Sequence, residues 1–208
     1  MCKNQISVNL GFTEEKFPAG THMCLIYNNE EEQRNIISKF VEGGLSAGEK
    51  VAYFADEMEP DQISEWLASM GVAVPNLKES SNFSVSSTAE TYHPEGIFKP
   101  EEMLDNLKVF YETAKEENFP ASRVTGEMSW ALKNIPGSNR LMEYEAKVND
   151  VLVKYPVTAV CQYDANEFDG ATLLECLKVH PYIIAQGQIV RNPYYMNTED
   201  FLKEWDLK

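Results

Sequence analysis

Residues 160–164, with the sequence VCQYD, place a thiol, an amide, a phenol and a carboxylate on consecutive positions. Alternate side chains of a strand face opposite sides, so we expect Cys161 and Tyr163 on one face and Gln162 and Asp164 on the other. A catalytic thiol needs a neighbouring base that converts it to the thiolate, and no sequence motif supplies one. A buried, unreactive Cys161 is therefore the favoured interpretation, and a nucleophile in an enzyme is the alternative.

A second cluster, residues 125–130 (TGEMSW), follows an expected strand. Glu127 can accept a hydrogen bond from a ligand, bind a metal ion or act as a general base, while Met128 and Trp130 can provide an apolar wall. The structural alternative is that Met128 and Trp130 fill the core, while Glu127 caps a helix or pairs with Arg123. Because the group gathers at a strand end, we favour a pocket lining.

The turn after the first core strand is where nucleotide-binding α/β proteins carry a glycine-rich loop and a lysine that hold phosphate. Here Tyr27 and Asn28 are followed by residues 29–34 (NEEEQR), which include three glutamates and neither glycine nor lysine. Asn28 or Asn29 can cap the following helix, and the glutamates suit the positive N-terminal end of that helix. The sequence therefore disfavours a bound triphosphate, although Tyr27 and Asn28 can still face a pocket.

The histidines are far apart in the sequence and form no metal-binding motif. His22 begins the first expected core strand and His180 the last, which places both at the amino edge of a parallel sheet. The strand from His22 to Tyr27 spans about 16 Å, so we expect His22 to lie outside a pocket at Tyr27. Each histidine can join a metal site with Cys24 or an aspartate, but a hydrogen-bonded structural role is favoured. His93 is expected at the surface.

Strand-like and helix-like runs alternate along the chain. Strands are expected at 21–27, 51–55, 83–86, from 123, at 157–163 and within 182–190; helices at 30–47, 62–70, from 100, at 141–152, 173–179 and 201–205; and a surface excursion at 92–98. This order predicts a single α/β domain over residues 1–208, with three layers and a mostly parallel sheet flanked by helices. Its core is expected at about 20–195, followed by a helical tail at 196–208.

Ligands of such sheets bind at the carboxyl ends of the strands. We therefore expect a ligand pocket there, formed by Tyr27, Asn28, Glu127, Met128, Trp130, Cys161, Tyr163 and Asp164.

The composition is that of an acidic globular protein. The 208 residues include 33 acidic and 18 basic side chains, giving a net charge of −15, and 43% of them are hydrophobic. This charge disfavours direct binding to nucleic acid or to an anionic membrane. No transmembrane run or signal-peptide core is visible, so a cytoplasmic protein is expected. The cysteines form no CxxC motif and are expected to be reduced thiols: Cys2, Cys24, Cys161 and Cys176.

Several phrases together resemble the MEDS family, the methanogen/methylotroph DcmR-type sensory domain. They are residues 20–27 (GTHMCLIY), 40–50 (FVEGGLSAGEK), 123–130 (RVTGEMSW), 144–147 (YEAK), 161–164 (CQYD), 180–181 (HP) and 192–195 (NPYY). The resemblance extends from about Gly20 to Tyr195. Further residues that belong to these phrases, without an assigned role, are His22, Arg123, Tyr144, Glu145, His180, Asn192 and Tyr195.

The resemblance implies a sensory domain of prokaryotic signal transduction or transcription regulation, in a family proposed to respond to simple hydrocarbon derivatives. Because no output segment follows Tyr195, we expect a separate output protein, a kinase or regulator, or self-association as a homodimer. The acidic turn favours a small neutral or cationic ligand. No catalytic activity is expected, and the sequence identifies neither a cofactor nor a metal.

A more distant resemblance is to the RecA/KaiC-type ATPase core without a functional phosphate-binding loop. It implies that Glu127 stands near the metal-binding acid of those ATPases. A degenerate nucleotide-binding protein is therefore a further alternative, although fold similarity alone does not give function.

Overall fold

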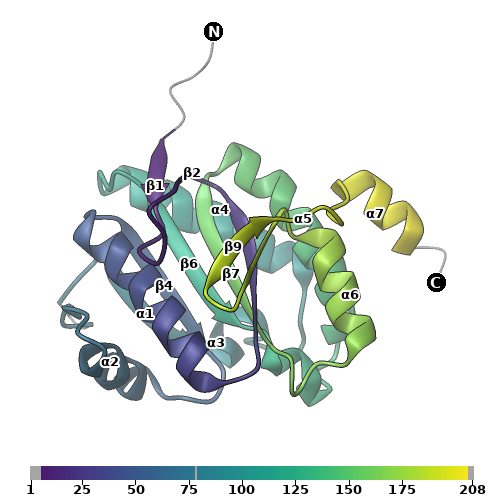
Figure 1. Cartoon of the computed structure of the whole chain (residues 1–208), viewed down its shortest axis with the longest axis horizontal. Coiled ribbons are helices and arrows are strands. Elements are labelled where there is room, and N and C mark those ends of the chain that lie inside the picture. The colour runs from purple at the N-terminus through teal and green to yellow at the C-terminus, as the bar shows by residue number, and fades with distance from the viewer. Residues whose placement is uncertain (1–5, 78, 206–208) are drawn as a thin grey trace, which may run out of the picture.

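A seven-stranded sheet forms the centre of the structure, with helices on both faces (Figure 1). The computed structural model describes residues 6–77 and 79–205, so Cys2 and residues 206–208 of the expected tail lie outside the described part. The strand order is β5-β4-β6-β7-β3-β8-β9, and neighbouring strands are parallel except for β8 and β9. These strands are β3 (His22–Tyr27), β4 (Lys50–Ala55), β5 (Phe83–Ser87), β6 (Ser122–Glu127), β7 (Val157–Asp164), β8 (Tyr182–Ala185) and β9 (Gln188–Arg191). The expected three-layer α/β fold is confirmed.

Side-chain alternation along each strand decides which helical layer a residue contacts. In β3, Met23 and Leu25 belong to one hydrophobic core and Cys24 belongs to the other. The first core lies under α1 (Glu30–Ser46), α2 (Pro60–Ser69) and the hairpin of β1 (Ser7–Asn9) and β2 (Lys16–Pro18). The second core is covered by α3 (Thr88–Tyr92), α4 (Pro100–Glu116), α5 (Leu141–Lys154), α6 (Gly170–Val179) and α7 (Thr198–Trp205).

The start of α1 confirms the capping role expected for the turn after β3. Asn29 accepts a hydrogen bond on its side-chain oxygen from the backbone N–H of Glu32, at 2.8 Å. Glu30, Glu31 and Glu32 occupy the first helical turn, where negative charge is favourable. The helix N-terminus is thus capped by the chain itself.

Two local expectations were incomplete. The strand expected within 182–190 is present as β8, but the run continues as the antiparallel hairpin β8–β9, because Gln186 and Gly187 adopt positive φ angles of 50° and 71° and reverse the chain. The surface excursion expected at 92–98 is exposed at residues 94–97, but it begins and ends on buried rings, since Tyr92 and Phe98 are 4% and 1% exposed. Aromatic packing against Trp130 holds this segment onto the helical layer.

Among the described residues, no helix combines the length and the apolar character that a bilayer crossing requires.

Candidate functional site

The carboxyl ends of β3, β4, β6 and β7 surround a cavity of about 240 Å³. This is the edge of a parallel sheet where ligands are expected to bind. The cavity is lined by Tyr27, Glu30, Gln33, Arg34, Tyr53, Glu57, Met58, Trp66, Glu127, Ser129, Asp164 and Glu167. We call it the carboxyl-edge cavity.

Glu127 is held in a fixed orientation at the end of β6. The Tyr53 hydroxyl donates a hydrogen bond to Glu127 Oε1 at 2.6 Å, and the backbone N–H of Asp56 donates to Oε2 at 2.7 Å. Burial raises the pKa of Glu127, and the charge of Asp56 adds to the rise, against the lowering effect of these hydrogen bonds. The result is a positioned acceptor whose negative charge is incompletely compensated.

Asp56 connects the cavity to the short helix η1 (Ser129–Lys133). Its Oδ2 accepts a hydrogen bond from the Ser129 hydroxyl at 2.7 Å and pairs with Lys133 Nζ at 2.9 Å. Its Oδ1 accepts from the Thr88 hydroxyl, also at 2.7 Å. Glu127 is therefore connected to η1 through two hydrogen bonds, one from the Asp56 backbone to Glu127 and one from Ser129 to the Asp56 side chain.

The cavity is strongly negative. Five carboxylates line it and Arg34 is the lining residue of opposite charge, already paired with Glu30 at 3.0 Å. Burial, followed by the charges of Asp164 and Glu127, raises the pKa of the Tyr27 phenol. Burial and the nearby Asp164 likewise raise the pKa of Glu167. Such a field attracts cations and repels phosphates.

The structure brings only part of the expected pocket together. Tyr27, Glu127 and Asp164 line the carboxyl-edge cavity. Asn28 lines a neighbouring depression beside the start of α1. The rest of the expected set lies on the opposite face of the sheet, in the core under α5: Met128, Trp130, Cys161 and Tyr163.

Trp130 and Met128 fill the core, as in the structural alternative, rather than lining the carboxyl-edge cavity. Both side chains are fully buried, and the Trp130 ring stacks on Tyr92 with centroids 5.0 Å apart. The chain turns immediately after β6, so Met128 and Trp130 enter the helical layer while Ser129 between them lines the cavity. His93 is half-buried, and its ring lies 5.7 Å from Trp130, which corrects its expected exposure.

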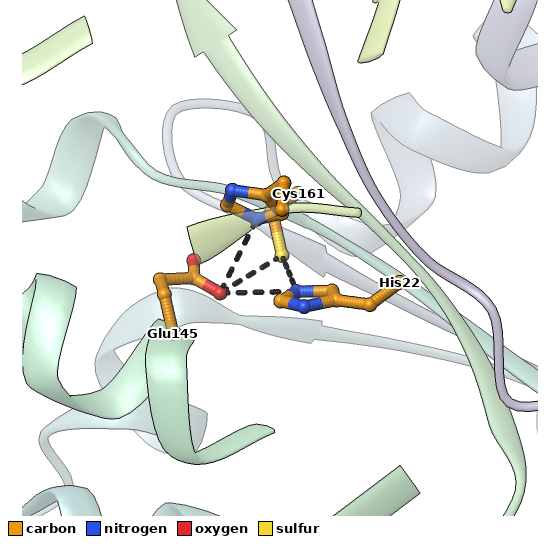
Figure 2. Close-up of side chains that lie close together, drawn as sticks. His22, Glu145 and Cys161 are labelled. Atoms are coloured by element: carbon orange, nitrogen blue, oxygen red, sulfur yellow. Dashed lines mark hydrogen bonds and ion pairs between the residues drawn. The ribbon is translucent and has the colours of Figure 1, made fainter. Parts of the chain in front are cut away.

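A buried cluster of titratable side chains lies on that opposite face. His22 on β3, Cys161 on β7, Glu145 on α5 and His180 after α6 approach one another closely, and all four are buried. Figure 2 shows the contacts converging on one carboxylate oxygen of Glu145. This oxygen, Oε2, lies 3.2 Å from His22 Nε2, 3.4 Å from Cys161 Sγ and 3.5 Å from His180 Nε2. We call these residues the buried quartet.

The expectation for the two histidines was right about the sheet edge and incomplete about their partners. Their rings lie 4.3 Å apart, and Cys24 lies near His180 as expected, but the carboxylate that both histidines face is Glu145 and not an aspartate. One signal was available in the sequence: Glu145 sits on the apolar stripe of its helix, between Tyr144 and Val148. A carboxylate at such a position requires a polar partner in the core.

Burial and neighbouring groups compete in setting the pKa values of the buried quartet. It raises the pKa of the Cys161 thiol well above its ordinary value, which argues against a thiolate nucleophile. Burial and the neighbouring His180 lower the pKa of His22. Burial also acts to lower the pKa of His180, but the neighbouring Cys24 and Glu145 outweigh it and raise the value to about 9. The neighbouring His180 and His22 lower the pKa of Glu145 despite its burial.

The other motif residues have structural contacts. Arg123 pairs with Glu49 and not with Glu127, so that sequence alternative was wrong. Asn192 donates a hydrogen bond to the carbonyl of His180 at 2.7 Å and fixes the chain after α6. Tyr144 packs edge-on against Phe98, with centroids 5.6 Å apart, and Tyr195 is half-buried in the segment before α7.

A third feature is an apolar cavity of about 410 Å³ beside η1, α5 and α6. It is lined by Ala131, Leu132, Ser138, Asn139, Leu141, Met142, Phe168, Ala171, Thr172, Glu175 and Trp205. Because Ser129 lines the carboxyl-edge cavity, η1 contributes to both cavities.

Comparison with known proteins identifies relatives in sequence and in fold. The family described as the methanogen/methylotroph, DcmR sensory domain (MEDS) matches residues 21–181. The transcriptional repressor DcmR of Methylorubrum extorquens is 25% identical over 160 residues, which are 76% of this chain and 57% of the repressor. The chain thus spans little more than half the length of that relative.

Solved structures with the same fold include KaiC-like proteins. The KaiC-like protein PH0186 of Pyrococcus horikoshii OT3 has a TM-score of 0.64 and 17% identity, over 87% of this chain and 80% of that protein. The flagellar accessory protein FlaH of Methanocaldococcus jannaschii has a TM-score of 0.62 and 12% identity, over 89% and 84% of the two chains. At these identities the likeness shows a RecA/KaiC-like fold alone.

Proposed function

This chain belongs to the MEDS family, the methanogen/methylotroph DcmR sensory domain, and we propose that the ligand it senses is a small organic cation of the alkylammonium class. The observation that carries the proposal is the carboxyl-edge cavity, which combines five carboxylates with aromatic side chains. Carboxylates attract the positive charge, and the faces of Tyr27, Tyr53 and Trp66 suit the methyl groups and the charge of an alkylated ammonium ion.

The size of the cavity restricts the ligand further. At about 240 Å³ it is smaller than the roughly 300–1,000 Å³ of ordinary small-molecule pockets. A ligand of a few non-hydrogen atoms fits this space, whereas a nucleotide is too large and carries the wrong charge. Alkylated amines are simple hydrocarbon derivatives, in keeping with the ligand class implied by the family resemblance.

The contacts of Asp56 support a route from ligand to output. A cation near Glu127 offsets the repulsion between the Glu127 and Asp56 carboxylates, which favours the arrangement in which Asp56 binds Ser129 and Lys133. The ligand would thereby shift η1 toward its ordered state. We propose that a separate regulatory protein reads this segment and that the chain itself is not an enzyme.

The experiment is a thermal-shift titration of the 208-residue chain with methylammonium through tetramethylammonium. Tert-butanol and dichloromethane serve as neutral ligands of similar size. We expect at least one cation to raise Tm in a saturable manner, because a ligand of the folded state stabilises it. Saturable stabilisation by the neutral compounds alone would contradict the proposal.

A pair of matched variants locates the binding site. Glu57→Gln with Glu167→Gln removes two exposed charges at the cavity, and each pair of this kind contributes about 0.2–1 kcal/mol. The loss of both interactions predicts that the dissociation constant for the cation increases by roughly 2- to 30-fold. The control, Glu42→Gln with Glu116→Gln, removes the same charge from α1 and α4, away from the cavity, and should bind as the parent does.

A neutral ligand in the apolar cavity is the second candidate. The observation that favours it is the predominantly apolar lining, including Leu132, Leu141 and Phe168, next to the same helix η1. If dichloromethane stabilises the protein and Ala171→Trp removes the effect while the glutamate variants do not, this second candidate is the correct one.

A further inference from the structure

The buried quartet has the geometry of a metal site. Four atoms face one another: His22 Nε2, Glu145 Oε2, Cys161 Sγ and His180 Nε2, all within 4.8 Å. Four of the distances among them are 3.2, 3.4, 3.4 and 3.5 Å. Zinc bonds of about 2.0–2.3 Å to nitrogen, oxygen and sulfur imply distances of roughly 3.3–3.8 Å between the ligand atoms of a tetrahedron. These four separations lie close to the edges of such a tetrahedron.

The same distances are long for a network of hydrogen bonds without a metal ion. Hydrogen bonds between charged nitrogen and oxygen groups are about 2.7–2.9 Å long, so 3.2 and 3.5 Å are poor examples. His180 Nε2 is buried and has no hydrogen-bond partner among the residues that the structure describes. A cation between these atoms satisfies all of them at once.

The surrounding contacts orient both imidazoles for this role. His180 Nδ1 donates to the carbonyl of Cys176 at 2.8 Å, which leaves Nε2 to face the quartet. His22 Nδ1 lies 3.1 Å from Asn149 Oδ1, and Asn149 Nδ2 donates to the carbonyls of Glu145, Ala146 and Val179. This pattern makes Asn149 Oδ1 the acceptor and places the His22 proton on Nδ1. Metal-bound histidines characteristically have such outer partners.

An outer hydrogen bond likewise orients the Glu145 carboxylate. The Tyr163 hydroxyl donates to Glu145 Oε1 at 2.8 Å, so Oε2 is the oxygen left for the shared point. The quartet therefore offers two imidazole nitrogens, one carboxylate oxygen and one sulfur, each with its lone pair directed inward.

We propose that His22, Glu145, Cys161 and His180 bind one divalent transition-metal ion, of which zinc fits best, in a closed four-coordinate site. Magnesium and calcium prefer all-oxygen ligand sets, whereas sulfur and imidazole ligands select zinc and its neighbours. Four protein ligands leave no position for a substrate, as in structural zinc sites. Metal binding requires the Cys161 sulfur and both imidazole Nε2 atoms to be free of protons. The metal ion therefore forms a bond to the Cys161 thiolate, and the thiol proton and the Nε2 proton of a charged His180 leave to solvent.

Such an ion would join separate parts of the fold. It would connect two neighbouring central strands, β3 and β7, with α5 and the chain after α6. This role is independent of the proposed cation sensing, which takes place on the opposite face of the sheet.

The test uses the full chain in a Cys2→Ser background, because Cys2 lies outside the described residues. The protein is loaded with Zn²⁺ or Co²⁺, desalted, and analysed for metal by mass spectrometry and for Co²⁺ by absorption. We expect one metal ion per chain, a sulfur-to-cobalt charge-transfer band and the intense visible bands of four-coordinate Co²⁺. A Co²⁺-loaded parent protein without the charge-transfer band would overturn the proposal, whatever the variants do.

The variants assign the ligands. Cys161→Ala should lose the charge-transfer band and the bound metal, with folding checked by circular dichroism. Cys24→Ala and Cys176→Ala are the matched controls, because these thiols lie with His180 in a rival three-residue cluster. They should keep the band. Loss of the band in the controls together with its persistence in Cys161→Ala would refute the quartet as the site.

Discussion

Arg123 and Glu49 form a doubly hydrogen-bonded ion pair in the interior of the protein. Arg123 Nε and Nη2 each donate to a Glu49 oxygen at 2.7 Å, and the two side chains are 0% and 3% exposed. Arg123 Nη1 donates to the carbonyl of Phe40 at 2.7 Å, and Nη2 also donates to the carbonyl of Asn9 at 3.0 Å. The pair thus joins β6 to α1 and to the N-terminal hairpin.

Arg123→Met should destabilise the protein by about 3–5 kcal/mol, because it leaves the Glu49 carboxylate buried without a partner. Adding Glu49→Leu should recover much of this loss, since the double variant buries no unpaired charge. The measurement is urea unfolding with an unchanged m-value. The control is Lys203→Ala, which removes an exposed pair with Glu199 worth at most about 1 kcal/mol. A loss in Arg123→Met no larger than in the control would contradict the structural role.

The stabilisation by an alkylammonium ion should depend on pH in one direction. Burial raises the pKa of Glu127, and partial loss of solvent together with the neighbouring Asp164 carboxylate raises that of the more exposed Glu167, both above the ordinary 4.5. A carboxyl group whose pKa is higher in the folded than in the unfolded protein stabilises the fold only while it is protonated. This contribution is complete below pH 4.5 and is lost as the pH rises through the pKa of the folded protein. The cation offsets that loss, because it favours the ionised carboxylates.

The increase in Tm at a fixed cation concentration should therefore be largest near neutral pH and fall on acidification before ordinary carboxyl groups titrate. Thermal shifts measured from pH 5 to 8 give the comparison, with the doubly substituted Glu57→Gln, Glu167→Gln protein as reference. A shift that grows toward acid pH is the outcome that this electrostatic account does not permit.

MgATP should not bind. The α1 N-terminus, where a phosphate would be held, is capped by Asn29 and followed by three glutamates. Asn29→Ala should lower stability by about 0.5–2 kcal/mol through loss of the cap, without creating a nucleotide site. Isothermal titration with MgATP tests the first expectation and urea unfolding the second. Saturable heat from MgATP would show that the acidic turn has been misinterpreted.

The sequence predicted the layers of this fold better than its sites. Apolar periodicity and capping residues were sufficient for the order of most strands and helices, as at Asn29, because these signals are local. The β8–β9 reversal was missed because Gln186 and Gly187 interrupt an apolar run too briefly to break its pattern.

The sites depend on relations that one sequence does not contain. Alternation correctly separated Cys161 and Tyr163 from Gln162 and Asp164, yet the proposed pocket mixed residues of both faces. The buried quartet draws on positions 22, 145, 161 and 180, and it requires the pairing of Cys24 with Cys161 across β3 and β7. That register is set by tertiary packing.

Coupling between the carboxyl-edge cavity and η1 gives the sharpest test of the sensory mechanism. Lys133 pairs with Asp56 but does not line the cavity, and its side chain is 49% exposed. Lys133→Met should therefore leave cation affinity within about 5-fold of the parent, because an ion pair with a half-exposed lysine contributes at most about 1 kcal/mol and the lost pair is not made to the ligand.

The change in η1 on cation binding should nevertheless shrink in Lys133→Met. In the proposed mechanism the cation strengthens the contacts of Asp56 with Ser129 and Lys133, so backbone amides of residues 129–133 of the parent should exchange hydrogen more slowly when it is bound. The variant removes one of the two contacts that transmit this effect to η1, and hydrogen exchange with mass spectrometry measures the difference. Lys203→Met on α7 is the control and should respond as the parent does. If cation binding slows hydrogen exchange of residues 129–133 equally in all three proteins, the Asp56–Lys133 pair does not transmit ligand binding to η1. The output surface would then lie elsewhere.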